Sequence, residues 1–202
     1  MADAATPPKL TRDESHIYRL GNRVVPGVTQ VLKSINELEG VDPRFLERAA
    51  QFGRHVDRAC QLWDYGALDE ERLDPGLRGH LNSWINFLKD TGAKVIESRL
   101  IVYHPRLHIA GELDYLLAWN ISPRPVLVDI KTNSSVLRAS RAQTALYKDA
   151  YEAMTGTKLA RARKVVHLLG EGRYDIKSYS DDGDLHIGIS CLNIHNWINQ
   201  TR

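Results

Sequence analysis

The spacing of apolar residues predicts two amphipathic helices in the first half of the chain. Residues 43 to about 66 place apolar side chains three or four positions apart, as one face of a helix requires. The members of that face are Phe45, Ala49, Phe52, Val56, Ala59, Cys60 and Trp63. A second face over residues 75–91 consists of Leu77, Leu81, Trp84, Ile85 and Leu88, and Gly92 ends it. Each helix begins at an Asp-Pro pair, in which Asp caps the helix and Pro takes its first position.

After Ala93 the pattern changes to short strand-forming runs separated by turn residues. Three strands are predicted at 94–103, 107–119 and 125–131, the first two as a hairpin around residues 104–106. A helix follows from residue 138 to about 155, and two more strands are predicted at 162–169 and 174–179. The pattern over 184–199 is ambiguous, and a closing helix is favoured.

The N-terminal region gives weaker signals. Residues 1–15 are predicted to be a flexible arm, followed by a small hairpin around Gly21-Asn22 and a short helix from Thr29 to Gly40. The whole order of elements predicts an α/β fold in a single domain spanning residues 1–202. A mixed central β-sheet would be flanked by α-helices, with a helical N-terminal half.

Composition narrows the class of protein. The chain has 202 residues, of which 43 % are hydrophobic, and this is sufficient for one well-buried core. The two cysteines, Cys60 and Cys191, lie far apart in the sequence and predict no disulfide framework, so a cytoplasmic location is expected. No apolar run approaches the ~18 residues that a membrane span needs, and no membrane partner is expected.

The charge is unevenly distributed although the net value is only +2. Residues 131–177 contain 10 basic and 4 acidic residues, a net of +6, whereas residues 1–130 carry a net of −2. A positive segment of this kind suits a polyanion such as DNA, and Arg138 and Arg141 are its predicted contacts. A basic surface that binds only solvent is the alternative.

The segment with the clearest chemistry is the predicted strand 125–131. Alternate side chains of a strand point to opposite faces, so Asp129 and Lys131 lie on one side. Asp114, from the preceding strand, would complete a cluster of two acids and one lysine. Such a cluster is the minimum that can hold a hard divalent cation and stabilise an anionic transition state. The alternative is a strand-end ion pair, worth ~0–1 kcal/mol when exposed.

Three motifs occur in order: Gly111-x-x-Asp114, Asp129-x-Lys131 and Gln143-x-x-x-Tyr147. Together they resemble the PD-(D/E)XK nuclease superfamily, specifically its RecB-like and phage exonuclease branch. The segment 25–32 is similar to the opening segment of many phage-encoded members, and the resemblance covers residues 18 to about 151. It implies a restriction-endonuclease-like core.

The resemblance also implies roles for individual residues. Asp114, Asp129 and the main-chain carbonyl of Ile130 would bind Mg²⁺, for which Mn²⁺ could substitute. Lys131 would orient or activate the attacking water and offset charge on the phosphate. Gln143 and Tyr147 would contact the DNA strand or support Lys131. Glu97 would join the metal site as a fourth catalytic residue, with an ordinary surface glutamate as the alternative, and Glu112 shares the strand face of Asp114.

One departure from the family pattern lies in the first long helix. The RecB-like branch has Gly-x-x-Val-His, whose His binds metal, whereas this chain has Gly53, Val56 and then Asp57. A carboxylate can also bind Mg²⁺, so Asp57 is predicted to substitute, and His55 is expected on the surface. The four cysteines that bind an iron–sulfur cluster in Cas4-like relatives are missing, so no such cluster is expected.

These features predict a metal-dependent DNA nuclease, favoured as a phage-type DNA-end exonuclease in recombination or DNA processing. A structure-specific endonuclease uses the same core and stays open. A DNA-binding scaffold with weak or no cleavage is the alternative from another class, and cleavage of RNA is a further one. The expected partners are DNA and a recombinase, annealing or single-strand-binding protein, and a homo-oligomer is possible by resemblance.

Overall fold

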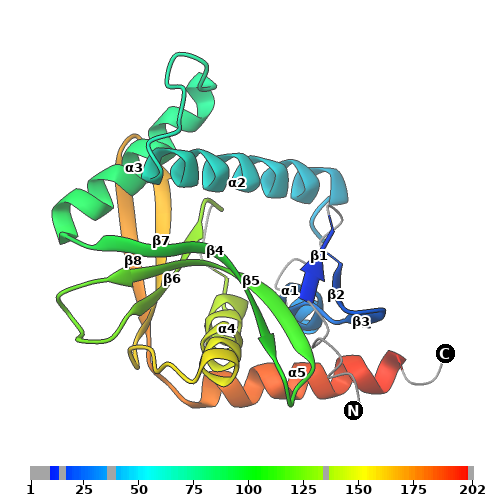
Figure 1. Ribbon diagram of the computed structural model, residues 1–202. Coiled ribbons are helices and arrows are strands. Elements are labelled where there is room, and N and C mark those ends of the chain that lie inside the picture. Colours follow the sequence, from blue (N-terminus) through cyan, green and yellow to red (C-terminus); the bar gives the residue numbers. More distant parts are fainter. Residues whose placement is uncertain (1–9, 14–16, 36–39, 134–136, 200–202) are drawn as a thin grey trace, which may run out of the picture.

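The computed structural model describes residues 10–13, 17–35, 40–133 and 137–199 of the chain (Figure 1). Its centre is a five-stranded sheet in the order β4-β5-β6-β7-β8. The strands are β4 (Lys94–His104), β5 (Ile109–Ala118), β6 (Val126–Lys131), β7 (Arg163–Gly170) and β8 (Arg173–Tyr179). Only β6 and β7 run parallel among these neighbours, and the other pairs are antiparallel. The predicted mixed sheet is therefore confirmed.

Helices cover both faces of this sheet (Figure 1). The α2 helix (Pro43–Asp64) and the α3 helix (Pro75–Thr91) lie on one face, and α4 (Ala139–Thr155) and α5 (Gly183–Asn199) lie on the other. One apolar cluster joins α2 and α3 to the sheet around the fully buried Trp84. A second cluster joins α4 and α5 to the opposite face around Leu146. The α/β fold class is confirmed, and the layers follow from the amphipathic faces of the helices.

The predicted helix boundaries are confirmed by their caps. Asp42 and Asp74 each accept a hydrogen bond from a main-chain amide two residues on, at 2.8 Å. Gly92 and Gly156 end α3 and α4 with φ values of 66° and 73°, the left-handed conformation that glycine adopts without strain. The α2 helix extends past the central sheet (Figure 1). Phe45, in its first turn, is 66 % exposed although it belongs to the predicted apolar face.

The N-terminal region differs from its prediction. A small antiparallel sheet consists of β1 (Leu10–Arg12), β2 (Tyr18–Leu20) and β3 (Arg23–Val25). The predicted hairpin is confirmed, but residues 10–12 form a strand where a flexible arm was expected. Residues 1–9 and 14–15 of that arm lie outside the described residues. A run of three residues carries too little periodicity to predict a strand that is defined by its pairing with β2.

The predicted helix from Thr29 to Gly40 is also modified. The chain forms a four-residue helix, α1 (Val28–Val31), and then a 3₁₀ helix, η1 (Leu32–Ile35). Residues 36–39 lie outside the described part. The N-terminal half is therefore helical only from α1 onward and not in its first segment. No described helix has the length and the apolar content that crossing a membrane requires.

Candidate active site

The middle of β5 and the end of β6 bring three charged side chains together. Lys131 Nζ lies 2.7 Å from Asp129 Oδ2 on the same strand. Asp114 Oδ2 accepts a hydrogen bond from the main-chain amide of Ile130 at 2.8 Å, so it is fixed to the neighbouring strand. Tyr115 is paired with Val128, and one step further along these antiparallel strands Asp114 faces Asp129. The structure thus gathers the two acids and the lysine that the motifs singled out.

Burial makes the charged forms of the acids in this cluster energetically costly. Asp129 is only 1 % exposed, and Asp129 Oδ1 has no hydrogen-bond partner among the described residues. Burial and the neighbouring Asp129 raise the pKa of Asp114 well above its usual range. Burial alone would lower the pKa of Lys131, but the carboxylates of Asp129 and Asp114 outweigh it and raise that pKa. The lysine therefore stays charged, and one cation faces two buried acids.

The donor atoms fit a hard divalent cation. A buried carboxylate oxygen without a partner is costly unless a cation neutralises it, and Mg²⁺ is bound by one or two carboxylates while it keeps several waters. Asp114 and Asp129 would be those carboxylates. Within the described residues, no three His, Cys, Asp or Glu side chains are grouped closely enough to hold a metal ion by themselves.

Helix α2 brings Asp57 to the edge of this cluster. A Cβ atom on Gly53, one turn before Asp57, would lie 3.3 Å from Thr132 Oγ1, so the helix passes close to the end of β6. Burial raises the pKa of Asp57, Arg99 opposes this effect, and the charges of Lys131 and Asp129 also act on it. His55 is exposed, as expected. Whether Asp57 binds metal stays a prediction.

Two arginines that were not predicted pair with the acids beside the cluster. Arg99 contacts Asp57 Oδ2 through Nη1 and Glu112 Oε1 through Nη2, both at 2.9 Å. Arg12, on β1, forms an ion pair with the other oxygen of Glu112. Glu97, by contrast, is exposed on β4 and has no ion pair with a described residue. No local pattern in the sequence indicated Arg99, because its two partners lie on α2 and β5, far from it in the chain.

The Gln143–Tyr147 motif lies on α4, beside the same acids. Gln143 Nε2 donates a hydrogen bond to the hydroxyl of Tyr147 at 3.2 Å. Burial raises the pKa of Tyr147, and the charges of Asp129 and Asp114 add to that effect. A Cβ atom on Gly111 would lie 2.4 Å from Tyr147 Cε1. The glycine of the first motif therefore leaves space for the tyrosine ring of the third.

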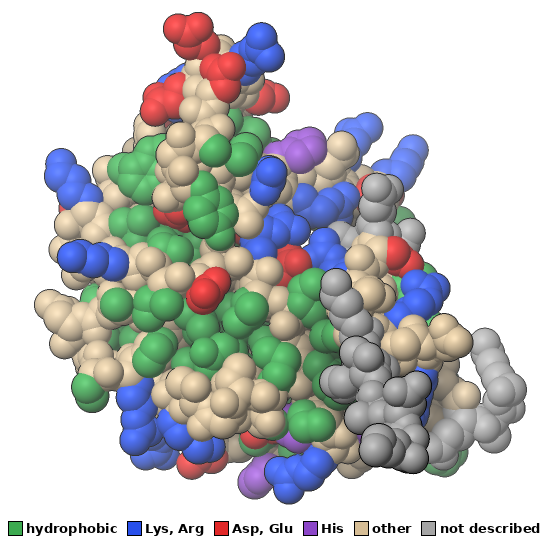
Figure 2. Space-filling view, in the orientation of Figure 1, with side chains coloured by type: hydrophobic (Ala, Val, Ile, Leu, Met, Phe, Trp, Pro, Cys, Tyr) green, Lys and Arg blue, Asp and Glu red, His purple; other side chains and the backbone are tan. Residues whose placement is uncertain are grey.

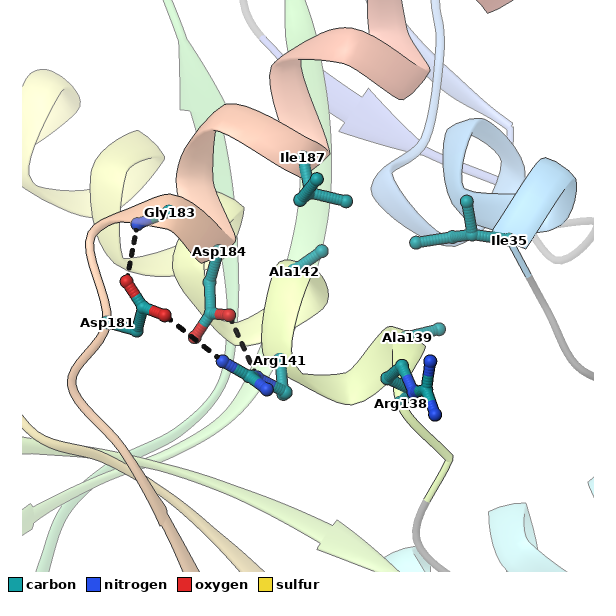
Figure 3. Close-up of a pocket in the computed structure, with 9 residues that line it drawn as sticks. All are labelled: Ile35, Arg138, Ala139, Arg141, Ala142, Asp181, Gly183, Asp184 and Ile187. Carbon is teal, nitrogen blue, oxygen red and sulfur yellow. Dashed lines mark hydrogen bonds and ion pairs between the residues drawn. The ribbon is translucent and has the colours of Figure 1, made fainter.

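Arg138 and Arg141 occupy a different place. They line a cavity of about 500 Å³ between the starts of α4 and α5, together with Ile35 and Ile187 (Figure 3). Arg141 Nε lies 2.9 Å from Asp184 Oδ1 and Arg141 Nη2 lies 3.4 Å from Asp181 Oδ2, which are contacts to the acidic C-terminal region. The same region also neutralises other members of the basic segment, since Arg163 Nη2 lies 2.5 Å from Asp184 Oδ2.

Exposed basic side chains that the charge count did not single out lie on α2. They are Arg44, Arg48, Arg54 and Arg58. Figure 2 shows Lys and Arg side chains gathered along α2 and beneath it, with acidic side chains between them. The charge count did not reveal these arginines, because acidic residues interspersed among residues 1–130 make the net charge of that segment slightly negative.

Comparisons with known proteins give a limited result. No protein-family model and no curated protein matches the chain. An alkaline exonuclease, LHK-Exo from Laribacter hongkongensis, is 14 % identical with a TM-score of 0.38 over 88 % of this chain and 92 % of that one. LHK-Exo in complex with dAMP gives 15 % identity and a TM-score of 0.39, covering 83 % and 84 % of the two chains. The structure of SSO0001 gives 14 % and 0.36, over 69 % and 71 %. At TM-scores below 0.5 these likenesses carry no weight for function.

Proposed function

We propose that this chain is a metal-dependent DNA nuclease, and a phage-type DNA-end exonuclease is the favoured form. The observation that carries the proposal is the carboxylate of Asp129. It is 1 % exposed, has an oxygen without a hydrogen-bond partner among the described residues, and lies beside Asp114 and Lys131. These three residues belong to the motifs whose order and spacing in the sequence resemble the PD-(D/E)XK superfamily.

In this proposal Asp114 and Asp129 hold Mg²⁺, or Mn²⁺ in its place. The ion would supply Lewis-acid chemistry, neutralising phosphate oxygens and making water a better nucleophile. The Ile130 amide fixes Asp114 through its hydrogen bond to Oδ2, which leaves the other oxygen for a ligand. Lys131 places an ammonium group beside the carboxylate pair, where it can orient the attacking water and stabilise negative charge that develops on the phosphate.

For the DNA strand, two groups of residues are proposed. Gln143 and Tyr147 lie beside the acids and would contact or support the strand at the reacting phosphate. The exposed arginines of α2 would contact phosphates further along, because guanidinium groups bind phosphate through paired hydrogen bonds. Arg138 and Arg141 stay candidates, although Arg141 would have to exchange Asp181 and Asp184 for phosphate.

Other parts of the proposal rest on the resemblance alone. They are a role in recombination or DNA processing, a recombinase, annealing or single-strand-binding partner, and a homo-oligomer. An iron–sulfur cluster is not proposed, because the chain has only two cysteines and such a cluster takes four thiolates.

Substrate choice tests the proposal most fully. End-labelled linear duplex, closed circular duplex, single-stranded DNA and an RNA oligomer are incubated with Mg²⁺, Mn²⁺ or EDTA. Loss of linear DNA only, and only with metal, is the expected result, and the label then gives the strand polarity. Nicking of the circle would replace the exonuclease by an endonuclease, and preferential loss of RNA would change the substrate class. DNA binding without cleavage under any condition would favour the scaffold.

A further inference from the structure

A chain of alternating charges leads from the N-terminal sheet to the candidate active site. Arg12 pairs with Glu112, Glu112 with Arg99, and Arg99 with Asp57. The side chains of the last three are 19 %, 26 % and 20 % exposed, so each charge is largely removed from water. Arg99 is the central member because its two terminal nitrogens each contact a different carboxylate at 2.9 Å.

The backbone at Arg99 is held in an uncommon conformation. Its φ is 52°, in the left-handed region that residues with a side chain rarely adopt. Such a conformation persists only where the surroundings hold it, and it is concentrated at functional sites. The strand position is also notable, since the neighbours of Arg99, Ser98 and Leu100, pair with Tyr115 and Leu113, the two neighbours of Asp114. The guanidinium is thus directed to a fixed location at the side of the acidic cluster.

The carboxylates that the guanidinium contacts could themselves bind a cation, in addition to the one proposed at Asp114 and Asp129. Asp57 and Glu112 come from α2 and β5, and their carboxylates are close enough for a single guanidinium to bridge them. Asp57 Oδ1 is buried and has no hydrogen-bond partner among the described residues. A divalent ion can also be bound by two carboxylates. The guanidinium differs from such an ion because it is covalently part of the chain and remains charged at every physiological pH.

We propose that Arg99 takes the place of a second metal ion, so that the site holds one divalent cation at Asp114 and Asp129. This inference rests on the proposed function, because it assumes an ion at that pair. Arg99 neutralises Asp57 and Glu112 and prevents them from gathering around another ion. It is a positioning residue, since it acts by fixing these two carboxylates.

Calorimetric titration of the full chain with Mn²⁺ tests the stoichiometry. The wild type is expected to bind one ion, and Arg99→Gln is expected to bind two, the second with weaker affinity. Removing one acid in Arg99→Gln/Asp57→Asn should return the count to one. Arg99→Lys is the matched control, because it keeps a cation and should stay at one. A count of one in a folded Arg99→Gln, or a second ion that survives loss of Asp57, would overturn the inference.

Manganese electron paramagnetic resonance of the wild type provides a test that depends on no variant. At saturation the expected spectrum is that of an isolated ion, and a spin-coupled pair of ions at the site would contradict the role of Arg99. A failure of the proposed function has a different signature. In that case the wild type binds no ion, or Asp129→Asn binds Mn²⁺ as well as the wild type does.

Discussion

At the scale of single residues, Asp129 and Lys131 carry the chemistry. The carboxylate of Asp129 is almost fully buried, and it forms an ion pair with the ammonium group of Lys131 at 2.7 Å. When both acids are ionised, the single lysine leaves the cluster short of positive charge, and this is why a cation is expected. The pair was predictable from sequence because strand alternation and motif order are local. Arg99 was missed because its role depends on contacts to two other elements.

Replacing Lys131 by Met should separate binding from chemistry. Cleavage is expected to fall by ~10²-fold or more, the scale for removing one transition-state stabiliser, while DNA affinity changes little. Single-turnover cleavage and fluorescence anisotropy measure the two quantities. Lys148→Met is the matched control, since Lys148 is also 22 % exposed and paired with an acid, Glu152, but lies outside the cluster. Full activity in Lys131→Met would remove the lysine from the mechanism.

At the scale of elements, α2 and β5 determine the geometry of the site. The Asp-Pro pair and the apolar spacing predicted the position of α2 correctly, and turn residues predicted where the strands of the central sheet begin and end. The sequence could not show that α2 passes within contact distance of Thr132, or that Gly111 receives the ring of Tyr147. Both are contacts between segments that are distant in sequence. A glycine indicates that another segment can approach closely, but it does not show which segment that is.

Gly111→Ala tests the packing of β5 against α4. The new methyl group would lie 2.4 Å from Tyr147 Cε1 and 3.3 Å from Val28 Cγ2, so the ring must move. We expect the free energy of unfolding to fall by about 1–3 kcal/mol, as for other overpacked cores. Urea unfolding measures this loss. The loss should shrink when the same substitution is made in Tyr147→Ala, and an equal loss in both backgrounds would show that the tyrosine is not the obstacle.

Asp64 gives the α2–α3 packing a pH dependence. Its carboxylate accepts a hydrogen bond from Trp84 Nε1 at 3.0 Å, and burial raises the pKa of Asp64 to about 6, from 3.8. The folded protein therefore keeps this proton to higher pH than the unfolded chain does. Its contribution favours folding at low pH and declines as the pH rises from about 4 to above 6.

Asp64→Asn should remove that decline, because the amide oxygen still accepts from Trp84 and does not ionise. Between pH 4.5 and 7.5 the stability of the variant relative to the wild type should rise by about 2 kcal/mol, from the linkage between pKa and stability. Chemical denaturation at the two pH values measures the difference. A constant difference across this range would show that Asp64 titrates normally in the folded protein.

At the scale of the whole molecule, the distribution of charge differs from the linear count. The basic segment 131–177 is largely paired, partly with the acidic residues after 180. Exposed arginines also line α2, where Arg44 and Arg54 form ion pairs with Asp42 and Glu47 at the surface. A count along the sequence cannot reveal this, because folding brings the acidic C-terminal residues back onto α4 and β7. The layer order was predictable, since it follows from which segments have one apolar face.

Arg48→Gln/Arg54→Gln tests α2 as the path of the DNA. We expect weaker binding and a decrease of about 2 in the slope of log affinity against log salt, since each phosphate contact contributes about 0.9. Arg161→Gln/Arg173→Gln is the control, because these arginines are also exposed but belong to the basic segment. An equal decrease in the control would contradict a path along α2, and a decrease confined to the control would assign the DNA path to the basic segment.

The central claim is that Asp114, Asp129 and Lys131 form a metal-dependent phosphodiesterase site. The most direct measurement is the rate at which the wild type and Asp129→Asn degrade an end-labelled linear duplex, each with Mg²⁺ and with EDTA. Asparagine keeps the size of the side chain and removes the buried charge. The account predicts Mg²⁺-dependent cleavage by the wild type, abolished by EDTA and reduced by ~10²-fold or more in the variant. Equal cleavage by a folded Asp129→Asn, or cleavage that persists in EDTA, would contradict it.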